Sequence, residues 1–304
     1  MTMTIYAIQN NKLAEIHEAP FKLEREIQKI IEDNLSEVMG LTLVRSEFTI
    51  KNRRIDTLAY DEQAKAFIII EYKRDKNVSV VDQGFTYLGL MLENKADFVL
   101  EHQGQLNSVL KIVHVDWSQT RVIFVSPSFT DNQVQATNFK DIAIELWEIK
   151  RYTNGSVAIT PIKKAKSAAS IKPLTQQNIE LKAISDEIKV YTEEDHRIYA
   201  NEEIYELYEQ FRDAILNLAS DIEIKPQKLY VAFKKDGNIA CLELQKKKMK
   251  IYIGSKVGLL DDPKGIAKDV SNIGHYGTGD YEVQVDSDKD LEYIMSLIKQ
   301  VVHV

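Results

Sequence analysis

The 304-residue sequence contains a single cysteine, Cys241, and no apolar stretch longer than a strand. One cysteine cannot form an internal disulfide and cannot build a thiolate metal cluster. Because a membrane-spanning helix needs roughly 18 or more consecutive apolar residues, the sequence predicts no transmembrane segment. The first residues lack a basic region followed by an apolar one, which argues against a secretory signal. These features predict a cytoplasmic protein without a membrane partner.

An excess of positive charge is also missing, since the formal net charge is −7. Proteins that coat nucleic acid usually carry basic surface, so this balance argues weakly against that class. It does not exclude an enzyme that acts on nucleic acid, because catalytic carboxylates add negative charge and a basic patch can be local. Solvated strand ends and turns are the other interpretation of the basic residues in one such stretch, which are Arg45, Lys51, Arg53, Arg54, Lys73, Arg74 and Lys76.

Helix and strand patterns alternate over roughly the first half of the chain. Apolar residues at helical spacing predict a helix over 22–39, and short apolar runs between turns predict the strands that follow. The further expected elements are strands 42–50, 53–60 and 66–73, helix 80–94, strand 98–100, helix 102–113, strand 121–126, helix 131–140 and strand 142–149. This order predicts an α/β domain over residues 1–160, with a mixed sheet covered by helices on both faces.

The composition changes after this domain. Residues 163–177 are rich in Lys, Ala, Ser and Gln and show no sustained apolar period, so we expect a linker over 161–190. The remaining segment, 191–304, predicts a small α+β accessory domain of unknown function. Its expected elements are helix 201–219, strands 228–234, 238–244, 249–254 and 281–285, and a last helix from Ser287 or Asp288 to Val302.

Three charged residues stand at the ends of strands that otherwise read as buried core: Asp56, Glu71 and Lys73. A charge in such a place costs free energy unless it is paired or bound to a metal. Glu71 and Lys73 are two apart on one strand, so their side chains share a face. A turn at 61–65 returns the preceding strand antiparallel, so the two carboxylates can converge on one Mg²⁺, which prefers oxygen ligands. The alternative is an Asp at a strand start and a solvent-facing Glu–Lys pair.

Helical residues extend this pattern. Glu24 lies on the first expected helix and could point over the sheet toward the site, with Glu26 as its rival. Gln83 and Tyr87 are four apart, hence on one helical face, where they could hydrogen-bond a phosphate or brace Lys73. Ordinary helix surface and helix packing are the alternatives for these residues.

In this order the residues resemble the motif of the PD-(D/E)xK nuclease superfamily, and the Gln-x-x-x-Tyr element looks most like its RecB-type and archaeal mismatch-endonuclease branches. The matching residues are Glu24, Asp56, Glu71-Tyr72-Lys73 and Gln83-x-x-x-Tyr87. Ile55 stands where the motif name implies Pro. The resemblance implies a restriction-endonuclease-like mixed sheet flanked by helices. It also implies that Asp56 and Glu71 bind Mg²⁺, with Mn²⁺ as a substitute. Lys73 would be the catalytic lysine and Glu24 an outer-shell ligand.

The C-terminal segment 269–283, with glycines at 274, 277 and 279, resembles an uncharacterised domain labelled "predicted transport protein". Such glycines permit positive φ and close backbone approach, as a phosphate-binding loop would need. The Lys-Ser/Thr ending of a P-loop is missing. A tight loop before strand 281–285 is therefore the favoured interpretation, with His275 in a structural role.

Together these features predict a metal-dependent nuclease that hydrolyses DNA phosphodiester bonds in repair, restriction or defence. No base-reading motif is evident, so the sequence leaves the substrate structure and RNA open, and a homodimer is compatible with it. The alternative is a non-catalytic nucleic-acid-binding or adaptor protein that retains the nuclease fold. The intact Asp56, Glu71 and Lys73 argue against that alternative, because a structural role would not require all three charges.

Overall fold

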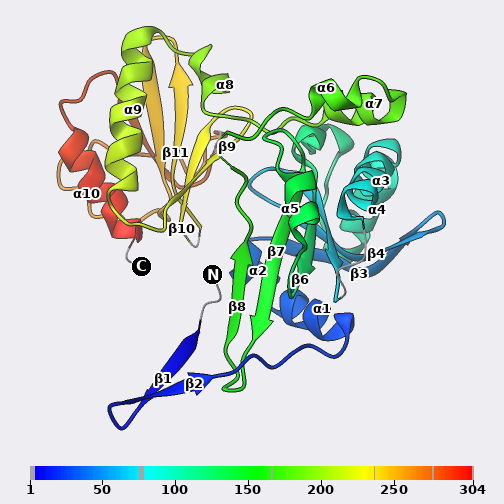
Figure 1. Ribbon diagram of the computed structural model, residues 1–304. Helices are drawn as coiled ribbons and strands as arrows, with labels where there is room; N and C mark the ends of the chain where they lie inside the picture. The colour runs from blue at the N-terminus through cyan, green and yellow to red at the C-terminus, as the bar shows by residue number, and fades with distance from the viewer. Residues whose placement is uncertain (1–3, 75–78, 166, 236, 276, 303–304) are drawn as a thin grey trace. The chain divides into compact units, whose positions relative to one another are not determined.

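Two six-stranded sheets, one in each of two units, organise the chain (Figure 1). The computed structural model describes residues 4–74, 79–165, 167–235, 237–275 and 277–302. The units span Met1–Val190 and Tyr191–Val304. Within the described residues, no helix combines the length and the apolar character that crossing a membrane requires.

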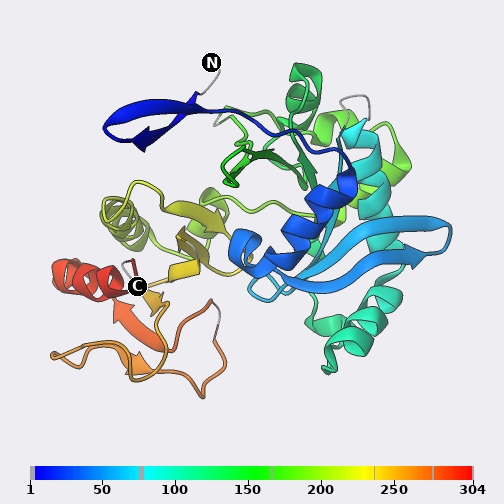
Figure 2. The same cartoon turned by 90° about the horizontal axis from the view of Figure 1, so that it is seen from below.

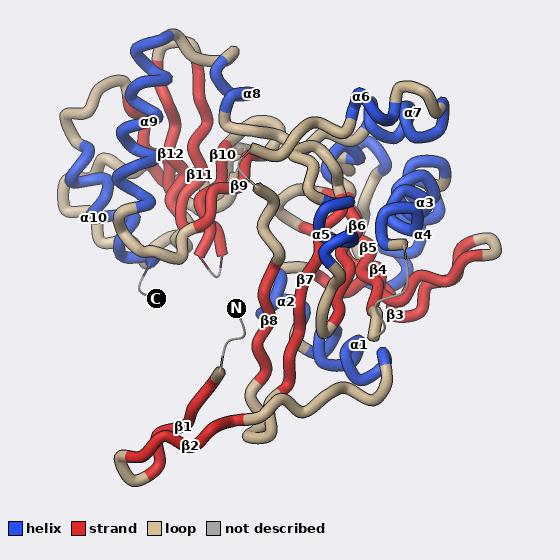
Figure 3. Tube along the Cα trace, in the orientation of Figure 1, coloured by secondary structure: helices blue, strands red, loops and turns tan. Residues whose placement is uncertain are grey.

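Helices and strands alternate along most of the first unit (Figure 3). Its elements are β1 (Ile5–Gln9), β2 (Lys12–Ile16), α1 (Glu24–Asp33), α2 (Leu35–Met39), β3 (Thr42–Ile50), β4 (Arg53–Asp61), β5 (Ala66–Tyr72), α3 (Val80–Glu93), α4 (Lys95–Leu106), η1 (Ile112–His114), η2 (Trp117–Gln119), β6 (Arg121–Ser126), α5 (Asp131–Thr137), β7 (Ile144–Arg151), β8 (Val157–Pro161), α6 (Lys172–Thr175) and α7 (Ile179–Glu187).

The sheet of this unit has the strand order β3-β4-β5-β6-β7-β8. Strands β3, β4 and β5 pair antiparallel, β5, β6 and β7 pair parallel, and β8 returns antiparallel to β7. The mixed, helix-flanked sheet that the sequence predicts is thereby confirmed. The β1–β2 hairpin is separate, and it projects from the rest of the unit in both Figure 1 and Figure 2.

Strand β5 is buried on both faces of the sheet by two apolar clusters. Its successive side chains alternate between these two faces. Ile68 and Ile70 belong to the apolar cluster that contains the α1 residues, whereas Phe67 and Ile69 belong to the cluster that contains the α3 residues. All four are fully buried, and each such side chain contributes roughly 1.5–3 kcal/mol of burial free energy. Glu71 therefore follows one of the most firmly packed segments of the sheet.

The segment 95–106 differs from its prediction. A strand at 98–100 and a separate helix at 102–113 were expected, but α4 runs without a break from Lys95 to Leu106. Phe98 and His102 are buried four residues apart, which places them on one helical face. The prediction was wrong because a three-residue apolar run has no period that distinguishes a strand from part of a helix.

Residues 161–190 also differ from the expected linker. Ile171 and Ile188 are buried in the same apolar cluster as α3, and Ile184 of α7 packs against it. Asn178 caps α7, since its side-chain oxygen accepts hydrogen bonds from two backbone N–H groups of the first turn. Only a few apolar residues of this segment pack against the rest of the first unit. Because the rest of the segment is polar, its composition did not indicate this packing.

The second unit is built on an antiparallel sheet of order β13-β14-β12-β11-β10-β9. Phe211 of α9 and Ile298 of α10 are fully buried in one apolar cluster with Phe233 and Ile251 of the sheet, so both helices cover the same face. The small α+β architecture follows the sequence prediction. Its elements are α8 (Glu194–Arg197), α9 (Glu202–Leu216), β9 (Glu223–Pro226), β10 (Val231–Lys235), β11 (Gly237–Gln245), β12 (Lys248–Ile253), β13 (Lys268–Asp269), β14 (Tyr281–Val285) and α10 (Leu291–Val302).

Candidate functional site

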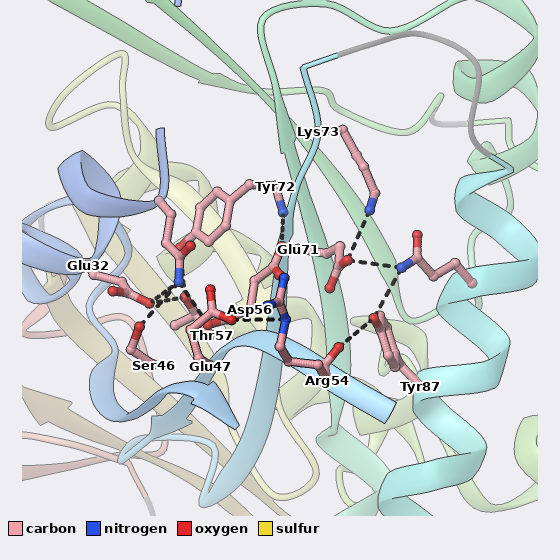
Figure 4. Close-up of polar contacts among 12 residues, drawn as sticks. Glu32, Ser46, Glu47, Arg54, Asp56, Thr57, Glu71, Tyr72, Lys73 and Tyr87 are labelled. Atoms are coloured by element: carbon pink, nitrogen blue, oxygen red, sulfur yellow. Dashed lines mark hydrogen bonds and ion pairs between the residues drawn. The ribbon is translucent and has the colours of Figure 1, made fainter. Parts of the chain in front are cut away.

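Asp56 and Glu71 lie side by side on the neighbouring strands β4 and β5 (Figure 4). The strands pair antiparallel with Thr57 opposite Ile70, so the next step along the ladder places Asp56 opposite Glu71. The backbone N–H of Tyr72 donates a hydrogen bond to Asp56 Oδ2 at 3.1 Å. This bond fixes the Asp56 carboxylate beside the end of β5.

The Glu71 carboxylate is buried, with 5% of the residue exposed. Its Oε1 accepts hydrogen bonds from Lys73 Nζ at 2.9 Å and from Gln83 Nε2 at 3.0 Å. Its Oε2 is buried and has no hydrogen-bond partner among the residues that the structure describes. Because an unpartnered buried carboxylate oxygen costs free energy, Oε2 is a position at which a cation would be stabilised.

Burial raises the pKa of Asp56 from 3.8 to about 6, and repulsion by the Glu71 carboxylate adds to this rise. The hydrogen bond from Tyr72 and the ammonium of Lys73 act in the opposite direction but are smaller causes. The proximity of two carboxylates in a partly buried place therefore disfavours the charged form of Asp56. A divalent cation between them would favour it.

Helix α3 brings an amide and a hydroxyl to the same place. Gln83 Nε2, besides its bond to Glu71, donates to the Tyr87 hydroxyl at 3.1 Å, and that hydroxyl donates to the Arg54 carbonyl at 3.3 Å. Gly84 permits the close approach of α3 to the sheet, because a Cβ there would lie 2.4 Å from Cδ1 of Ile144. A chain of hydrogen bonds thus connects β5, α3 and β4.

The two carboxylates at the start of α1 have different partners. Glu24 Oε1 accepts a hydrogen bond from the backbone N–H of Arg74 at 2.9 Å, so it contacts the chain one residue beyond Lys73. Glu26 Oε2 forms an ion pair with Arg151 at 3.3 Å. Glu24 is therefore the α1 carboxylate at the end of β5, where it supports the backbone.

A second set of hydrogen-bonded polar residues, which was not predicted from the sequence, connects α1 to the backbone of Asp56. Gln28 is 8% exposed, and its Nε2 donates to the Asp56 carbonyl and to Glu32 Oε1, each at 3.0 Å. The Thr57 hydroxyl donates to the same Glu32 oxygen and lies 3.1 Å from the Tyr72 hydroxyl. This group supports the backbone of Asp56. It also supports Tyr72, whose N–H donates to the Asp56 carboxylate.

The sequence contained a signal for this group. Gln28 and Glu32 are four residues apart, and each directly follows a fully buried isoleucine, Ile27 or Ile31. Two polar residues beside the apolar stripe of a helix at this spacing form a pair that can face the sheet. Without the partner strands, however, the pair is indistinguishable from a solvated helix edge.

Asp56 and Glu71 are the two carboxylates that could hold a metal ion in this site. Across the described parts of the chain, no group of three or more His, Cys, Asp or Glu side chains is arranged to hold a metal ion. Mg²⁺ is commonly bound through one or two carboxylates, with waters and substrate phosphates as further ligands. The unpartnered Oε2 of Glu71 and the raised pKa of Asp56 fit such an ion, because a cation would remove both costs.

Some basic residues near this site are already paired. Arg54 Nε forms an ion pair with Glu47 Oε2 at 2.9 Å, and Arg45 forms one with Glu101 at 3.4 Å. Lys76 lies outside the described residues. The positive character expected here is therefore partly compensated by acidic side chains of the same unit.

A groove of about 1080 Å³ lies beside α3, away from the carboxylates. Its lining includes Phe85 and Phe139 together with Lys51 and Arg53, and it contains neither Asp56 nor Glu71. This groove and the buried charges at the strand ends are thus separate features, and the buried charges form the candidate site. Buried charge is the more specific indicator, because it has an energetic cost that packing does not explain.

The C-terminal glycine-rich loop is held tightly against its sheet. Gly279 has a φ of +115°, and a Cβ there would lie 1.9 Å from the carbonyl oxygen of Ile253. The ring of His275 stacks on that of Tyr252, with centroids 4.8 Å apart. Tyr276 lies outside the described residues. These contacts agree with a structural loop and a structural histidine.

Residues 194–301 match the family model described as "Domain of unknown function (DUF5655)". The match covers most of the second unit, and the description names no transport role.

Several solved structures, one of them described as a repair endonuclease, resemble part of the chain at low TM-scores. A complex of EndoMS with double-stranded DNA has a TM-score of 0.26 and 20% identity, over 38% of this chain and 40% of that one. A repair endonuclease from Pyrococcus abyssi has a TM-score of 0.23 and 18% identity, over 40% and 44%. SfsA from Pyrococcus furiosus in complex with Ca²⁺ has a TM-score of 0.26 and 15% identity, over 53% and 70%.

One relative matches over nearly its whole length. An uncharacterised protein from Haemophilus influenzae is 53% identical over 300 residues, which cover 99% of each chain. The matched residues span both units of this chain and the connection between them. The chain therefore belongs to the same family as this Haemophilus influenzae protein.

Proposed function

We propose that the first unit is a metal-dependent nuclease that hydrolyses phosphodiester bonds of DNA. Asp56 and Glu71 would hold the metal, Lys73 would act on the phosphate, and Gln83 and Tyr87 would keep Glu71 and Lys73 in place. Mg²⁺ is the expected metal, with Mn²⁺ as a substitute, because both ligands are carboxylates.

The observation that carries the proposal is the environment of Glu71. A buried carboxylate at the end of a core strand has one oxygen bound by Lys73 and Gln83, and the other has no hydrogen-bond partner in the described part of the chain. A purely structural Glu–Lys pair needs neither the free oxygen nor a second carboxylate, Asp56, in the next strand. Metal-dependent phosphodiester hydrolysis needs a site for the metal and a cation where negative charge develops.

The metal and the surrounding side chains would have different roles in the reaction. A bound divalent metal would supply an activated water and would polarise the phosphate. Lys73, which is 16% exposed at its side chain, would stabilise the charge that develops on the phosphate oxygens. Gln83 would hold the Glu71 carboxylate in one orientation, and the protonated Tyr87 hydroxyl would orient Gln83.

The test is a cleavage assay with purified protein and labelled oligonucleotides. Single-stranded, duplex, mismatched and branched DNA, and RNA, are each incubated with Mg²⁺, Mn²⁺ or Ca²⁺. We expect cleavage of at least one DNA substrate with Mg²⁺ or Mn²⁺, and loss of that cleavage in Glu71→Gln. Glu62→Gln is the matched control, because Glu62 is exposed in the β4–β5 turn at the other end of the same hairpin.

The second candidate function is a non-catalytic nucleic-acid-binding protein with the same fold. The observation that favours it is that, among the described residues, no group of three or more His, Cys, Asp or Glu side chains is arranged to hold a metal ion. Binding of DNA without cleavage of any of these substrates, with either metal, would support this function and overturn the nuclease proposal.

A further inference from the structure

Arg54 lies on the same face of β4 as Asp56, because the two are two residues apart on one strand. The pairing of β4 with β5 begins at Thr57 and Ile70, so Arg54 lies at the start of β4, before that pairing. The start of β4 thus carries a cation two residues before a carboxylate. The proposed mechanism uses the carboxylate pair and Lys73 and leaves the guanidinium of Arg54 without a role.

The backbone of Arg54 is held by a hydrogen bond, whereas its side chain is exposed to solvent. Its carbonyl accepts the hydrogen bond from Tyr87, which connects it to Gln83 and Glu71 (Figure 4). Its side chain is 67% exposed, and its recorded ion pair is the one with Glu47. The guanidinium is therefore anchored close to the carboxylates yet accessible from solvent.

Glu47, the partner of Arg54, has an unusual backbone. Its φ is +55°, and among the described non-glycine residues with positive φ it is the one that lies inside a strand; the others lie in turns or at a helix end. Glu47 is also in register with Asp56, between the pairs Ser46–Thr57 and Phe48–Ile55. A bulky residue in the left-handed region is uncommon and strained, and such strain gathers at ligand-binding places.

We propose that Arg54 is a phosphate-binding residue of the nucleic-acid site, and that Glu47 holds its guanidinium when no nucleic acid is bound. The inference rests on the nucleic-acid binding that the proposed function includes, and not on cleavage. A guanidinium binds a phosphate through parallel N–H···O bonds, and it does so at least as well as it binds a carboxylate. The phosphate next to the reacting one would replace Glu47 as the partner of the Arg54 guanidinium, while Lys73 contacts the reacting phosphate.

This arrangement predicts opposite effects for the two partners. Arg54→Gln removes a phosphate contact and should raise the Kd for DNA about tenfold. It should also reduce the slope of log K against log[salt] by about 0.7–0.9. Glu47→Gln removes the competing partner and should lower the Kd about two- to fivefold, the range of an exposed ion pair. The double variant should match Arg54→Gln, because Glu47 acts through Arg54.

The experiment measures fluorescence anisotropy of labelled single-stranded and duplex oligonucleotides with the full chain in Ca²⁺, over a series of salt concentrations. The control pair is Lys65→Gln and Glu62→Gln, since Lys65 and Glu62 form an exposed ion pair in the turn at the opposite end of the β4–β5 hairpin. These two variants should leave the Kd and the salt slope unchanged. Circular dichroism melting confirms that each variant is folded.

The outcomes separate this inference from the nuclease proposal. If the wild type cleaves DNA and Arg54→Gln binds with unchanged Kd and salt slope, the role of Arg54 is refuted and the nuclease proposal stands. If Arg54→Gln weakens binding as expected but no metal supports cleavage, the phosphate contact stands and the nuclease proposal fails. An equal gain from Glu47→Gln with and without Arg54 would show general charge repulsion and overturn the holding role of Glu47. A wild type without affinity for DNA or RNA would overturn both proposals.

Discussion

The backbone N–H of Tyr72 donates a hydrogen bond to the carboxylate of Asp56 at 3.1 Å. Because Tyr72 directly follows Glu71, this bond holds two carboxylates next to each other in a partly buried place. Such an arrangement is unfavourable without a cation besides Lys73, since the two negative charges repel and both lose solvation. The relationship therefore gives predictions for stability, for pH dependence and for chemistry.

Asp56→Asn should abolish metal binding while leaving the metal-free protein as stable as the wild type or more stable. The amide oxygen of Asn can still accept the N–H of Tyr72, but the repulsion with Glu71 is gone. Differential scanning calorimetry with and without Mg²⁺ measures both effects, with an upward shift of Tm by the metal in the wild type alone. A variant that melts well below the metal-free wild type would show that the Asp56 charge is structural.

The raised pKa of Asp56 predicts how stability changes with pH. The pKa is 3.8 in the unfolded chain and about 6 in the folded one, so the folded state binds more protons between these values. The contribution of Asp56 to stability should therefore fall as the pH rises from about 4 to 6, by at most about 3 kcal/mol. Denaturant unfolding at a series of pH values should show the wild type losing stability relative to Asp56→Asn over this range. A constant difference between the two proteins would refute the raised pKa.

Lys73 should matter more for chemistry than for affinity, because its ammonium acts where charge develops in the transition state. We expect Lys73→Ala to bind DNA in Ca²⁺ with nearly the wild-type Kd and to lose cleavage in Mg²⁺. Lys73→Arg should also be impaired, since a planar guanidinium does not replace a compact ammonium. Lys65→Ala, in the turn of the same hairpin, is the control. Cleavage by Lys73→Ala at the wild-type rate would remove this lysine from the mechanism.

Thr57→Val tests the set of polar residues, Gln28, Glu32, Thr57 and Tyr72, that connects α1 to the backbone of Asp56. Valine keeps the shape of threonine but leaves the Glu32 carboxylate and the Tyr72 hydroxyl without the Thr57 hydroxyl, a change that should cost about 1–3 kcal/mol of unfolding free energy. Thr49→Val, an exposed position on β3, should change stability little. Hydrogen exchange should show faster exchange of the Tyr72 amide in Thr57→Val, and metal affinity should fall with it. An unchanged amide and an unchanged metal affinity would limit Thr57 to packing.

The strand ends that carry the carboxylates could be predicted because their signals are local. The run Ile68–Ile70 before Glu71 has the composition of a buried strand, and the β4–β5 turn fixes the pairing that brings Asp56 opposite. The packing of residues 161–190 could not be predicted, because Ile171 and Ile188 are anchored by α3, nearly a hundred residues earlier. Gln28 was missed for the same reason, since two of its partners, Ser46 and Asp56, lie on strands β3 and β4.

The most direct test of the account is one metal titration that follows two signals in the same sample. Mn²⁺ is added to the protein with a labelled DNA substrate, while electron paramagnetic resonance reports bound metal and gel analysis reports cleaved DNA. We predict that cleavage rises with metal occupancy in the wild type, that Glu71→Gln loses both signals, and that Glu62→Gln keeps both. Metal binding that survives in Glu71→Gln, or cleavage that does not follow occupancy, would contradict the assignment of the metal to Asp56 and Glu71.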